Sequence, residues 1–277
     1  MRPAAVLLAL LAIFLPGAGQ AQPATAVRIV AIGDFGVGGT SQQRLGDAVR
    51  RFEARYGAGL LLTLGDNDYT EQPSAFRANW ERSFGWARRK GLRVAGVLGN
   101  HDVRVEEGRY EFSTLQMPGR YYGRQLGPVE LFLLDSNSVD AAQTAWLRRR
   151  LALSKARWKI AVFHHPAYTC ANYTSHPEVV RRWVPLFERY RVRLVLSGHD
   201  HNYQRFAPRQ GVRYVVHGGG SPYSYALKPC PAGYPRRVKA RRDQGFLYLV
   251  VRGDRLDGWS VRVDGRRVDH FAFRADG

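Results

Sequence analysis

The chain has 277 residues, of which 45% are hydrophobic, and this is the composition of a globular protein with enough apolar side chains for a substantial core. Its formal net charge is +19, and a field this positive attracts anions, phosphorylated substrates included. Arginine is spread along the whole chain, and no lysine- and arginine-rich block with interleaved aromatic residues stands out. The composition therefore excludes a disordered chain and gives no reason to expect a dedicated nucleic-acid partner.

The amino terminus has the pattern of a secretory signal peptide. A positive start at Arg2 is followed by an apolar run over residues 4–15 and by a tail of small residues that reaches Ala21. The run is too short to span a bilayer, and no later segment approaches about 20 apolar residues, so we expect no transmembrane anchor. We predict that residues 1–21 are removed and that the protein is exported to the periplasm or the extracellular space. An uncleaved amino-terminal anchor is the alternative.

The rest of the chain alternates between apolar runs rich in β-branched residues and stretches with helical spacing. The apolar runs end in glycine or polar turns and are typical of strands buried on both faces. They are residues 27–32, 60–64, 94–98, 130–134, 158–163, 194–196 and 214–216. The predicted helices are residues 41–56, 74–88, 141–153 and 177–190. Helix-start signals support them: a Thr/Ser cap for the first, Pro73 and Asp140 before the next two, and Pro177 in the last.

The carboxyl-terminal part changes character. Residues 246–251, 259–263 and 268–273 read as antiparallel strands, with a turn at Asp264-Gly265. Strand–helix alternation before them indicates layers of helix on sheet. We therefore predict an α/β (α+β) fold, a four-layer αββα sandwich of two mixed β-sheets flanked by helices. No linker or repeat divides residues 22–277, so we expect one domain and a monomer.

Five of the predicted strands are followed directly by side chains that can bind a metal ion. These side chains are Asp34, Asp66, Asn100, His164, His199 and His201. Open α/β sheets place their sites at the carboxyl ends of strands, although any one of these residues alone is also an ordinary turn residue. Two carboxylates, one amide oxygen and three imidazoles form a mixed set of donors that suits iron, zinc or manganese. The sequence thus predicts a metal site at the strand ends.

The order of these motifs resembles the binuclear metallophosphoesterases and, more narrowly, the purple, tartrate-resistant acid phosphatases. The matching motifs are Asp34-x-Gly36, Gly65-Asp66-Asn67-Asp68-Tyr69, Gly99-Asn100-His101-Asp102, Phe163-His164-His165-Pro166 and Gly198-His199-Asp200-His201. They cover the chain from residue 28 to about residue 220. The amino-terminal β domain of the large plant enzymes is absent, so the resemblance implies the short form, with residues 22–277 as a single catalytic domain.

One exchange carries the narrower resemblance. Most relatives have a histidine two residues after the first aspartate, whereas this chain has Gly36 there and Tyr69 three residues after Asp66. In the purple acid phosphatases the corresponding tyrosine binds the metal as a phenolate and selects ferric iron. An aromatic ring that merely packs under the loop is the alternative for Tyr69.

The resemblance implies a set of roles for the site residues. The ferric ligands would be Asp34, Tyr69 and His201; the ligands of a divalent iron, zinc or manganese ion would be Asn100, His164 and His199; and Asp66 would bridge the two ions. A metal-bound hydroxide would then attack the phosphorus of a phosphate monoester, as in an acid phosphatase. His101 would contact the substrate or protonate the leaving group, beside Asn100. His176 would lie near the leaving group, although its spacing is longer than in familiar forms.

Three other residues need separate expectations. Asp68 stands where relatives often have an apolar or amide residue, and we expect it to face solvent or an arginine. Cys170 and Cys230 are the two cysteines of the chain, and export would allow them to oxidise, so a disulfide between them is a hypothesis.

Two other functions remain open at this point. A phosphodiesterase or nucleotide pyrophosphatase on the same scaffold is compatible with the positive charge. A non-catalytic exported protein that binds anions or metals would be expected to lack ligands, whereas the set here is complete. The expected substrate is a phosphorylated small molecule or protein.

Overall fold

The computed structural model describes residues 26–276, so the predicted signal peptide, residues 1–21, lies outside the described residues. Its first sheet has the strand order β13-β12-β11-β1-β2-β3. These strands are β1 (Val27–Ile32), β2 (Leu60–Thr63), β3 (Arg93–Ala95), β11 (Gly245–Arg252), β12 (Arg255–Arg262) and β13 (Arg267–Arg274). Strands β1, β2 and β3 run parallel, whereas β11 to β13 form the predicted antiparallel part and join the sheet beside β1.

The second sheet has seven strands in the order β10-β8-β9-β7-β6-β5-β4. They are β4 (Tyr122–Leu126), β5 (Val129–Leu133), β6 (Trp158–Val162), β7 (Leu194–Ser197), β8 (Tyr203–Phe206), β9 (Arg213–His217) and β10 (Arg237–Arg241). Strands β5, β6, β7 and β9 are parallel, and antiparallel strands complete the sheet on both sides. Both sheets are therefore mixed, as predicted.

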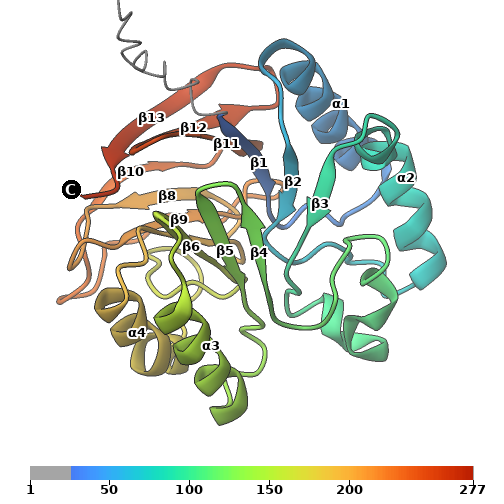
Figure 1. Cartoon of the computed structure of the whole chain (residues 1–277). Helices are drawn as coiled ribbons and strands as arrows, with labels where there is room; N and C mark the ends of the chain where they lie inside the picture. Colours follow the sequence, from blue (N-terminus) through green and yellow to red (C-terminus); the bar gives the residue numbers. More distant parts are fainter. Residues whose placement is uncertain (1–25, 277) are drawn as a thin grey trace, which may run out of the picture.

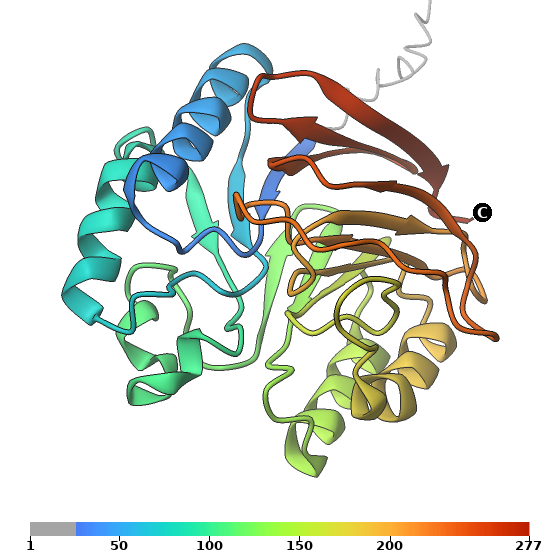
Figure 2. The ribbon, with the colours of Figure 1, turned by 180° about the vertical axis from the view of Figure 1, so that it is seen from behind.

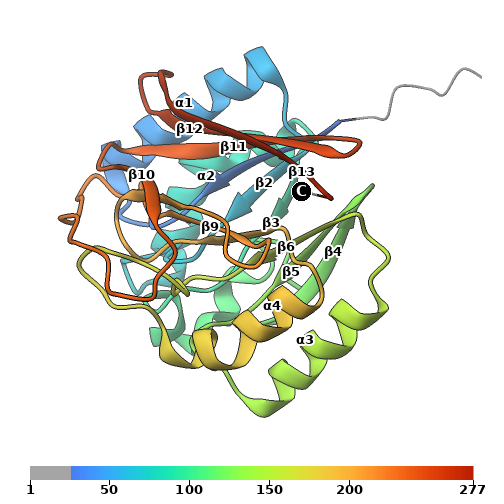
Figure 3. The same cartoon turned by 90° about the vertical axis from the view of Figure 1, so that its left-hand side faces the viewer.

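Helices cover the outer faces of the two sheets. They are α1 (Gly39–Tyr56), α2 (Pro73–Arg89), α3 (Ala141–Leu153) and α4 (Val184–Arg189), with a π-helical turn at Val179–Trp183 and short 3-10 turns at Asp102–Arg104 and Glu106–Glu111. Figures 1 and 2 show α1 and α2 on one side of the molecule and α3 and α4 on the other. Figure 3 shows the sheets between them, which confirms the predicted sandwich of helices and two mixed sheets. No helix in the described part of the chain is long and apolar enough to span a membrane.

Two apolar cores hold the layers together. The larger core includes Ile29 and Leu247 from the first sheet and Ile160 from the second, all completely buried, and it extends beneath α1 and α2. The smaller core lies between the second sheet and its helices, where Trp183 and Phe187 pack against the strands. Burial of one such side chain contributes about 1.5–3 kcal/mol, so these cores fix the ends of the strands.

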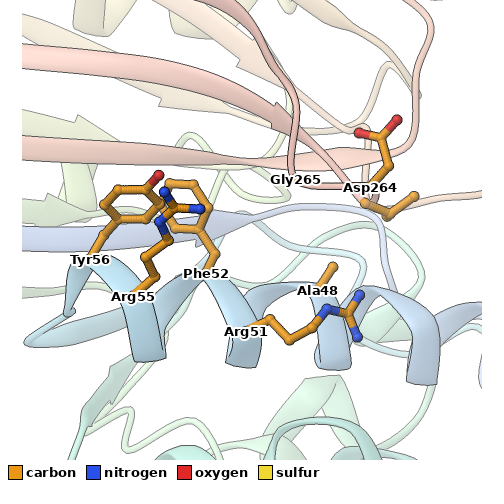
Figure 4. A pocket seen from close by; sticks show the side chains of 8 residues that line it. Ala48, Arg51, Phe52, Arg55, Tyr56, Asp264 and Gly265 are labelled. Atoms are coloured by element: carbon orange, nitrogen blue, oxygen red, sulfur yellow. The ribbon is translucent and has the colours of Figure 1, made fainter.

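Helix α1 is fixed to the carboxyl-terminal strands by aromatic contacts. The ring of Phe52 lies 5.3 Å from that of Phe246 and 5.0 Å from that of Tyr248. The Arg267 guanidinium lies 4.7 Å from the centre of the Tyr56 ring. Figure 4 shows Phe52 and Tyr56 rising from α1 toward the strands. These contacts tie the helix that follows the first predicted metal-binding motif to the antiparallel tail.

Two predicted elements differ from the structure by more than their last residue. The strand predicted at residues 94–98 ends at Ala95, because both backbone groups of Gly96 bond the Tyr122 hydroxyl instead of a neighbouring strand. The helix predicted at residues 177–190 is interrupted by the π-helical turn before α4. Pro185 explains the interruption, since proline lacks an N–H and its ring displaces the preceding turn.

The first predicted helix begins earlier than its Thr/Ser signal indicated. Helix α1 starts at Gly39, and the Gln42 side chain accepts a hydrogen bond of 2.9 Å from the Gly38 N–H.

The structure also contains a disulfide between Cys170 and Cys230. It joins the segment after β6 to the segment before β10, and the Lys228 N–H donates to the Cys170 carbonyl over 2.9 Å beside it. Both segments lead toward the candidate site.

Candidate metal centre

The predicted ligands follow strands whose carboxyl ends meet between the sheets. Strands β1, β2 and β3 lead to Asp34, Asp66 and Asn100, and β6 and β7 lead to His164 and His199. Three of these residues have a left-handed backbone, with φ of 60° at Asp34, 50° at Asp66 and 70° at His199. Such a conformation costs about 1–3 kcal/mol in a residue other than glycine and is typical of functional sites.

Asp34 is completely buried and touches the last predicted motif. Its Oδ2 accepts a hydrogen bond of 2.9 Å from the backbone N–H of His199. Its Oδ1 lies 3.5 Å from His201 Nε2 and receives no hydrogen bond from the described residues. Burial raises the pKa of Asp34 well above its usual range, and the nearby Asp66 carboxylate adds to this. A cation beside Oδ1 would offset the free-energy cost of burying a charged carboxylate.

Asp66 stands at the middle of the site. Its Oδ1 accepts from the His101 N–H over 3.0 Å and lies 3.4 Å from His164 Nε2, while its Oδ2 accepts from the Tyr69 hydroxyl over 3.1 Å. Burial alone would raise the pKa of Asp66, but His164 and the hydrogen bonds hold it below the usual range. Asp66 is thus the carboxylate that reaches both groups of donors.

Tyr69 points into the site and does not pack beneath the loop. Its hydroxyl oxygen lies 3.1 Å from His201 Nε2 as well as 3.1 Å from Asp66 Oδ2. Burial and the neighbouring carboxylates of Asp34 and Asp66 raise the pKa of the phenol far above its usual value. The geometry therefore places the phenol oxygen among the predicted metal-binding donors, whereas a ring that merely packs beneath the loop would not need to lie there.

The three predicted histidine ligands are held by contacts that orient their free nitrogens inward. His164 and His201 direct Nδ1 to backbone carbonyls, of Leu64 over 2.9 Å and of Tyr223 over 3.0 Å, which leaves Nε2 facing the site. His199 Nδ1 lies 3.2 Å from His164 Nε2. Burial lowers the pKa of His199 to about 2 and that of His201 to about 4, so both rings are neutral and able to donate an electron pair.

His164 differs from the other two rings. Burial would lower its pKa, but the Asp66 carboxylate raises it to about 10. His164 and Asp66 therefore form a buried ion pair when no other cation is beside them. A bound metal ion would take the place of the imidazolium proton as the partner of Asp66.

Asn100 and His101 occupy the loop that closes over Asp66. Asn100 Oδ1 is shielded from solvent and accepts no hydrogen bond from the described residues. His101 is half-buried, its ring centre lies 4.4 Å from that of Tyr69, and burial lowers its pKa. Asn100 thus offers an unused oxygen, whereas the His101 side chain lies beside the donors at a more open position.

His165 and His176 extend the histidine cluster. The ring of His165 lies 4.5 Å from that of His199 and 5.5 Å from that of His176. The nitrogens of His164, His165 and His199 come within 4.8 Å of one another, although His165 Nδ1 is engaged with the Ser136 hydroxyl over 2.9 Å. The structure therefore brings His165, the neighbour of His164 in its motif, close to the predicted donors.

The packing around Gly36 explains why the first motif lacks the histidine that most relatives have at this position. A Cβ at this position would lie 2.3 Å from the backbone of Asn67 and Asp68. Gly36 also accepts from the Tyr69 N–H over 3.0 Å, and its own N–H donates to Asp66 over 3.2 Å. The loop that brings Tyr69 into the site thus occupies the space of a side chain at residue 36.

Replacement of Gly36 by alanine is expected to destabilise the protein by about 1–3 kcal/mol, because the two loops must separate to admit a methyl group. Thermal unfolding of the purified variant measures this. Gly119→Ala is the matched control, since a Cβ there meets nothing within 4 Å. A Gly36→Ala protein as stable as the control would contradict the packing described.

The expectation for Asp68 is wrong. Asp68 is buried and accepts hydrogen bonds from Thr70 N over 2.9 Å, Thr70 Oγ1 over 2.7 Å and the Tyr110 hydroxyl over 3.2 Å. These three donors satisfy its carboxylate away from the site, so neither solvent nor an arginine is needed.

Asp102 has a role that the motif alone did not reveal. It is buried and accepts from the N–H groups of Asn67 over 2.8 Å, Asp68 over 3.0 Å and Gly99 over 2.6 Å. Burial and the nearby Asp66 raise its pKa to about 6. Asp102 thus joins the loop of Asp66 to the loop of Asn100 and fixes their separation.

Two tyrosines that the sequence did not indicate stack on predicted ligands. The ring of Tyr173 lies 4.0 Å from that of His199, and the ring of Tyr225 lies 4.1 Å from that of His201. The Tyr225 N–H also donates to the His201 carbonyl over 3.1 Å. Both tyrosines lie in irregular segments without a spacing pattern, so only the folded structure places them beside the ligands.

The donors fit a metal centre. Asp34, Asp66 and His201 bring oxygen and nitrogen atoms within 4.8 Å of one another, and the His164 group adjoins them through Asp66. Buried carboxylates require a partner charge, and two shielded oxygens, Asp34 Oδ1 and Asn100 Oδ1, have no hydrogen-bond donor in the described chain. Mixed oxygen and imidazole donors suit transition metals, so the residues present can hold such ions.

The comparison with known proteins agrees with this chemistry. The sequence profile of the family Metallophos, calcineurin-like phosphoesterase, matches residues 27–203. The chain belongs to this family. A calcineurin-like phosphoesterase is a metal-dependent hydrolase, and the matched region contains all five predicted motifs.

A curated relative and a solved structure are similar to this chain over most of its length. Tartrate-resistant acid phosphatase type 5 of Rattus norvegicus is 26% identical over 295 residues, which cover 89% of this chain and 90% of the rat protein. The purple acid phosphatase PPD1 from yellow lupin (Lupinus luteus) seeds has a TM-score of 0.75 at 16% identity, over 91% of this chain and 54% of that one.

A third comparison shows the fold without deciding the activity. GAP50, described as the anchor in the inner membrane complex of Plasmodium, has a TM-score of 0.78 at 16% identity, over 90% of this chain and 89% of that one. Fold likeness at this identity says nothing about catalysis, so the activity of this calcineurin-like phosphoesterase has to be argued from its own donors.

Proposed function

We propose that the protein is an exported acid phosphatase, with residues 22–277 as a single catalytic domain, that hydrolyses phosphate monoesters at a binuclear metal centre. The position of Asp66 is the observation that carries this proposal. Asp66 reaches Tyr69 through one oxygen and His164 through the other, at 3.1 and 3.4 Å. A carboxylate with donors on both sides is the arrangement that a bridging ligand requires.

The donors divide into two groups around Asp66. Asp34, Tyr69 and His201 would hold Fe(III), because a phenolate is a hard anionic ligand, and the Tyr69 oxygen lies 3.1 Å from His201 Nε2. Asn100, His164 and His199 would hold a divalent iron, zinc or manganese ion. When bound, two such cations supply charge neutralisation on the phosphate and a nucleophilic water of lowered pKa.

The chain's own residues would position the substrate. His101 stands at a half-buried position beside Tyr69. Its backbone N–H donates to Asp66, so its imidazole ring is the part that is available to a phosphate oxygen or a leaving group. Asn100 lies next to it on the same loop. The ring centre of His176 lies 5.5 Å from that of His165, which is next to the predicted ligand His164, and His176 would face the leaving group. The net charge of +19 would favour the approach of anionic esters.

The test compares one chromophore in two esters. The protein is recovered from the periplasm, and its amino-terminal residue shows whether residues 1–21 were removed on export. It is expected to hydrolyse p-nitrophenyl phosphate with a higher kcat/KM than bis(p-nitrophenyl) phosphate at mildly acidic pH. The reason is that the neighbouring Asn100 and His101 would contact the phosphate oxygens that a monoester leaves free. A large preference for the diester would indicate a phosphodiesterase, and no hydrolysis of either ester by metal-loaded protein would indicate a non-catalytic role.

A further inference from the structure

A cavity lies between the edges of the two sheets, away from the candidate metal centre. It has a volume of about 200 Å³ and is lined by residues of β8, β9, β10 and β13. Strand β13 is the outer strand of the first sheet and β10 that of the second, and Figure 1 shows both at the same side of the molecule. Arg213, on the cavity wall, begins β9, a parallel neighbour of β7. The metal-binding residues follow the other ends of the parallel strands, so this cavity is separate from them.

The walls of the cavity are mostly apolar. Phe206, Val215 and Phe273 are buried residues that line it, and Val238 and Phe271 complete the lining. A cavity of about 150 Å³ with such walls can hold a benzene molecule. The space between the sheet edges is therefore large enough for a small ring or a short branched chain.

Three arginines give this apolar cavity a positive charge. They are Arg205, Arg213 and Arg236. Arg205 is neutralised, because its Nε and Nη2 donate to Asp269 over 2.7 and 3.1 Å. No carboxylate in the described chain lies within 4.0 Å of Arg213 or Arg236.

Arg213 is the least satisfied of the three. Its guanidinium carbon lies 4.0 Å from the centre of the Phe273 ring, and its Nη1 is shielded from solvent without a hydrogen-bond acceptor in the described residues. Burial, together with Arg193, lowers its pKa. A shielded N–H without an acceptor lowers the stability of the folded protein, and an anion in the cavity would supply the missing acceptor.

We infer that this cavity binds a small organic anion, whose acidic group pairs with Arg213 and Arg236 and whose ring-sized apolar part packs against Phe271 and Phe273. The unpaired guanidinium groups select the charge, and the phenylalanine walls select an apolar group over a bare inorganic anion. A carboxylate or a sulfonate joined to one ring has both features.

Benzenesulfonate is the probe. It contains no ester bond, so the metal centre cannot hydrolyse it during the titration. Titration calorimetry of the full protein is expected to show one site, with inorganic sulfate and benzyl alcohol each binding at least about tenfold more weakly. Arg213→Gln should weaken benzenesulfonate roughly tenfold or more. Arg241→Gln, on the exposed end of β10, should leave its affinity unchanged.

Several outcomes would overturn the inference: no binding by the wild type, equal binding of either control compound, or unchanged affinity in Arg213→Gln. Thermal unfolding verifies that the variants are folded. If Arg213→Gln does not fold, Arg236→Gln at the exposed rim provides the same test, and unchanged affinity there would equally remove the proposed site.

Discussion

The Asp66→Asn variant is expected to lose bound metal, and its kcat/KM for a phosphate monoester should fall by more than about 100-fold. This loss is larger than the loss of activity usually seen when a residue that only hydrogen-bonds a metal ligand is replaced. The substitution keeps the shape of the side chain and removes its charge. Asp66 contacts Tyr69, His101 and His164 at 3.0–3.4 Å, so the neutral amide would leave both groups of donors without their shared carboxylate. Metal content by mass spectrometry and rates on p-nitrophenyl phosphate measure the two effects.

His101→Ala provides the contrasting control. Alanine retains the backbone N–H that donates to Asp66, so this variant should keep its metal while kcat falls by about 10²-fold or more. Asp47→Asn, on the exposed face of α1, should change neither quantity. Retention of full metal content by Asp66→Asn would contradict the bridging role, and metal loss by His101→Ala would make that histidine a ligand.

Much of the site could be predicted because its donors directly follow strongly apolar strands. Asp34, Asp66 and His164 come two or three residues after β1, β2 and β6, and buried strands of this kind are easily recognised in a sequence. Parallel strands that end at one edge bring such residues together, so the order of motifs was sufficient to predict the cluster without any distance.

The strands that the sequence analysis did not predict are the more polar ones. Strands β4 and β10 form the two edges of the second sheet, and β8 lies next to β10. Their sequences, YGRQL, RVKAR and YQRF, carry charged or amide side chains, as protected sheet edges often do. They lack the continuous apolar run of a central strand, so their pairing is decided by the neighbouring strands.

Contacts between distant loops are the other part that a sequence does not reveal. Asp68 is satisfied by Tyr110, 42 positions later, which is why its expected exposure was wrong. Tyr173 and Tyr225 stack on His199 and His201 from two segments that a disulfide joins. Each of these contacts depends on how two irregular segments pack, and no spacing within either segment encodes it.

Tyr69→Phe gives the sharpest test of the proposed ferric site. Wild-type protein loaded with iron is expected to absorb broadly in the visible region, because a phenolate bound to Fe(III) transfers charge to the metal. The Tyr69 oxygen lies 3.1 Å from both Asp66 Oδ2 and His201 Nε2, so its removal deletes the one phenol oxygen that the described structure places among the donors, and the band should vanish.

Tyr110→Phe is the matched control for that experiment. Tyr110 lies against the same loop, but its hydroxyl donates to Asp68 over 3.2 Å and lies outside the donor set, so the band should persist in this variant. A colourless wild type with a full complement of iron would refute the tyrosinate assignment. A band that survives in Tyr69→Phe and disappears in another tyrosine variant would assign the phenolate to that residue, and Tyr225, stacked on His201, would then be the first to examine.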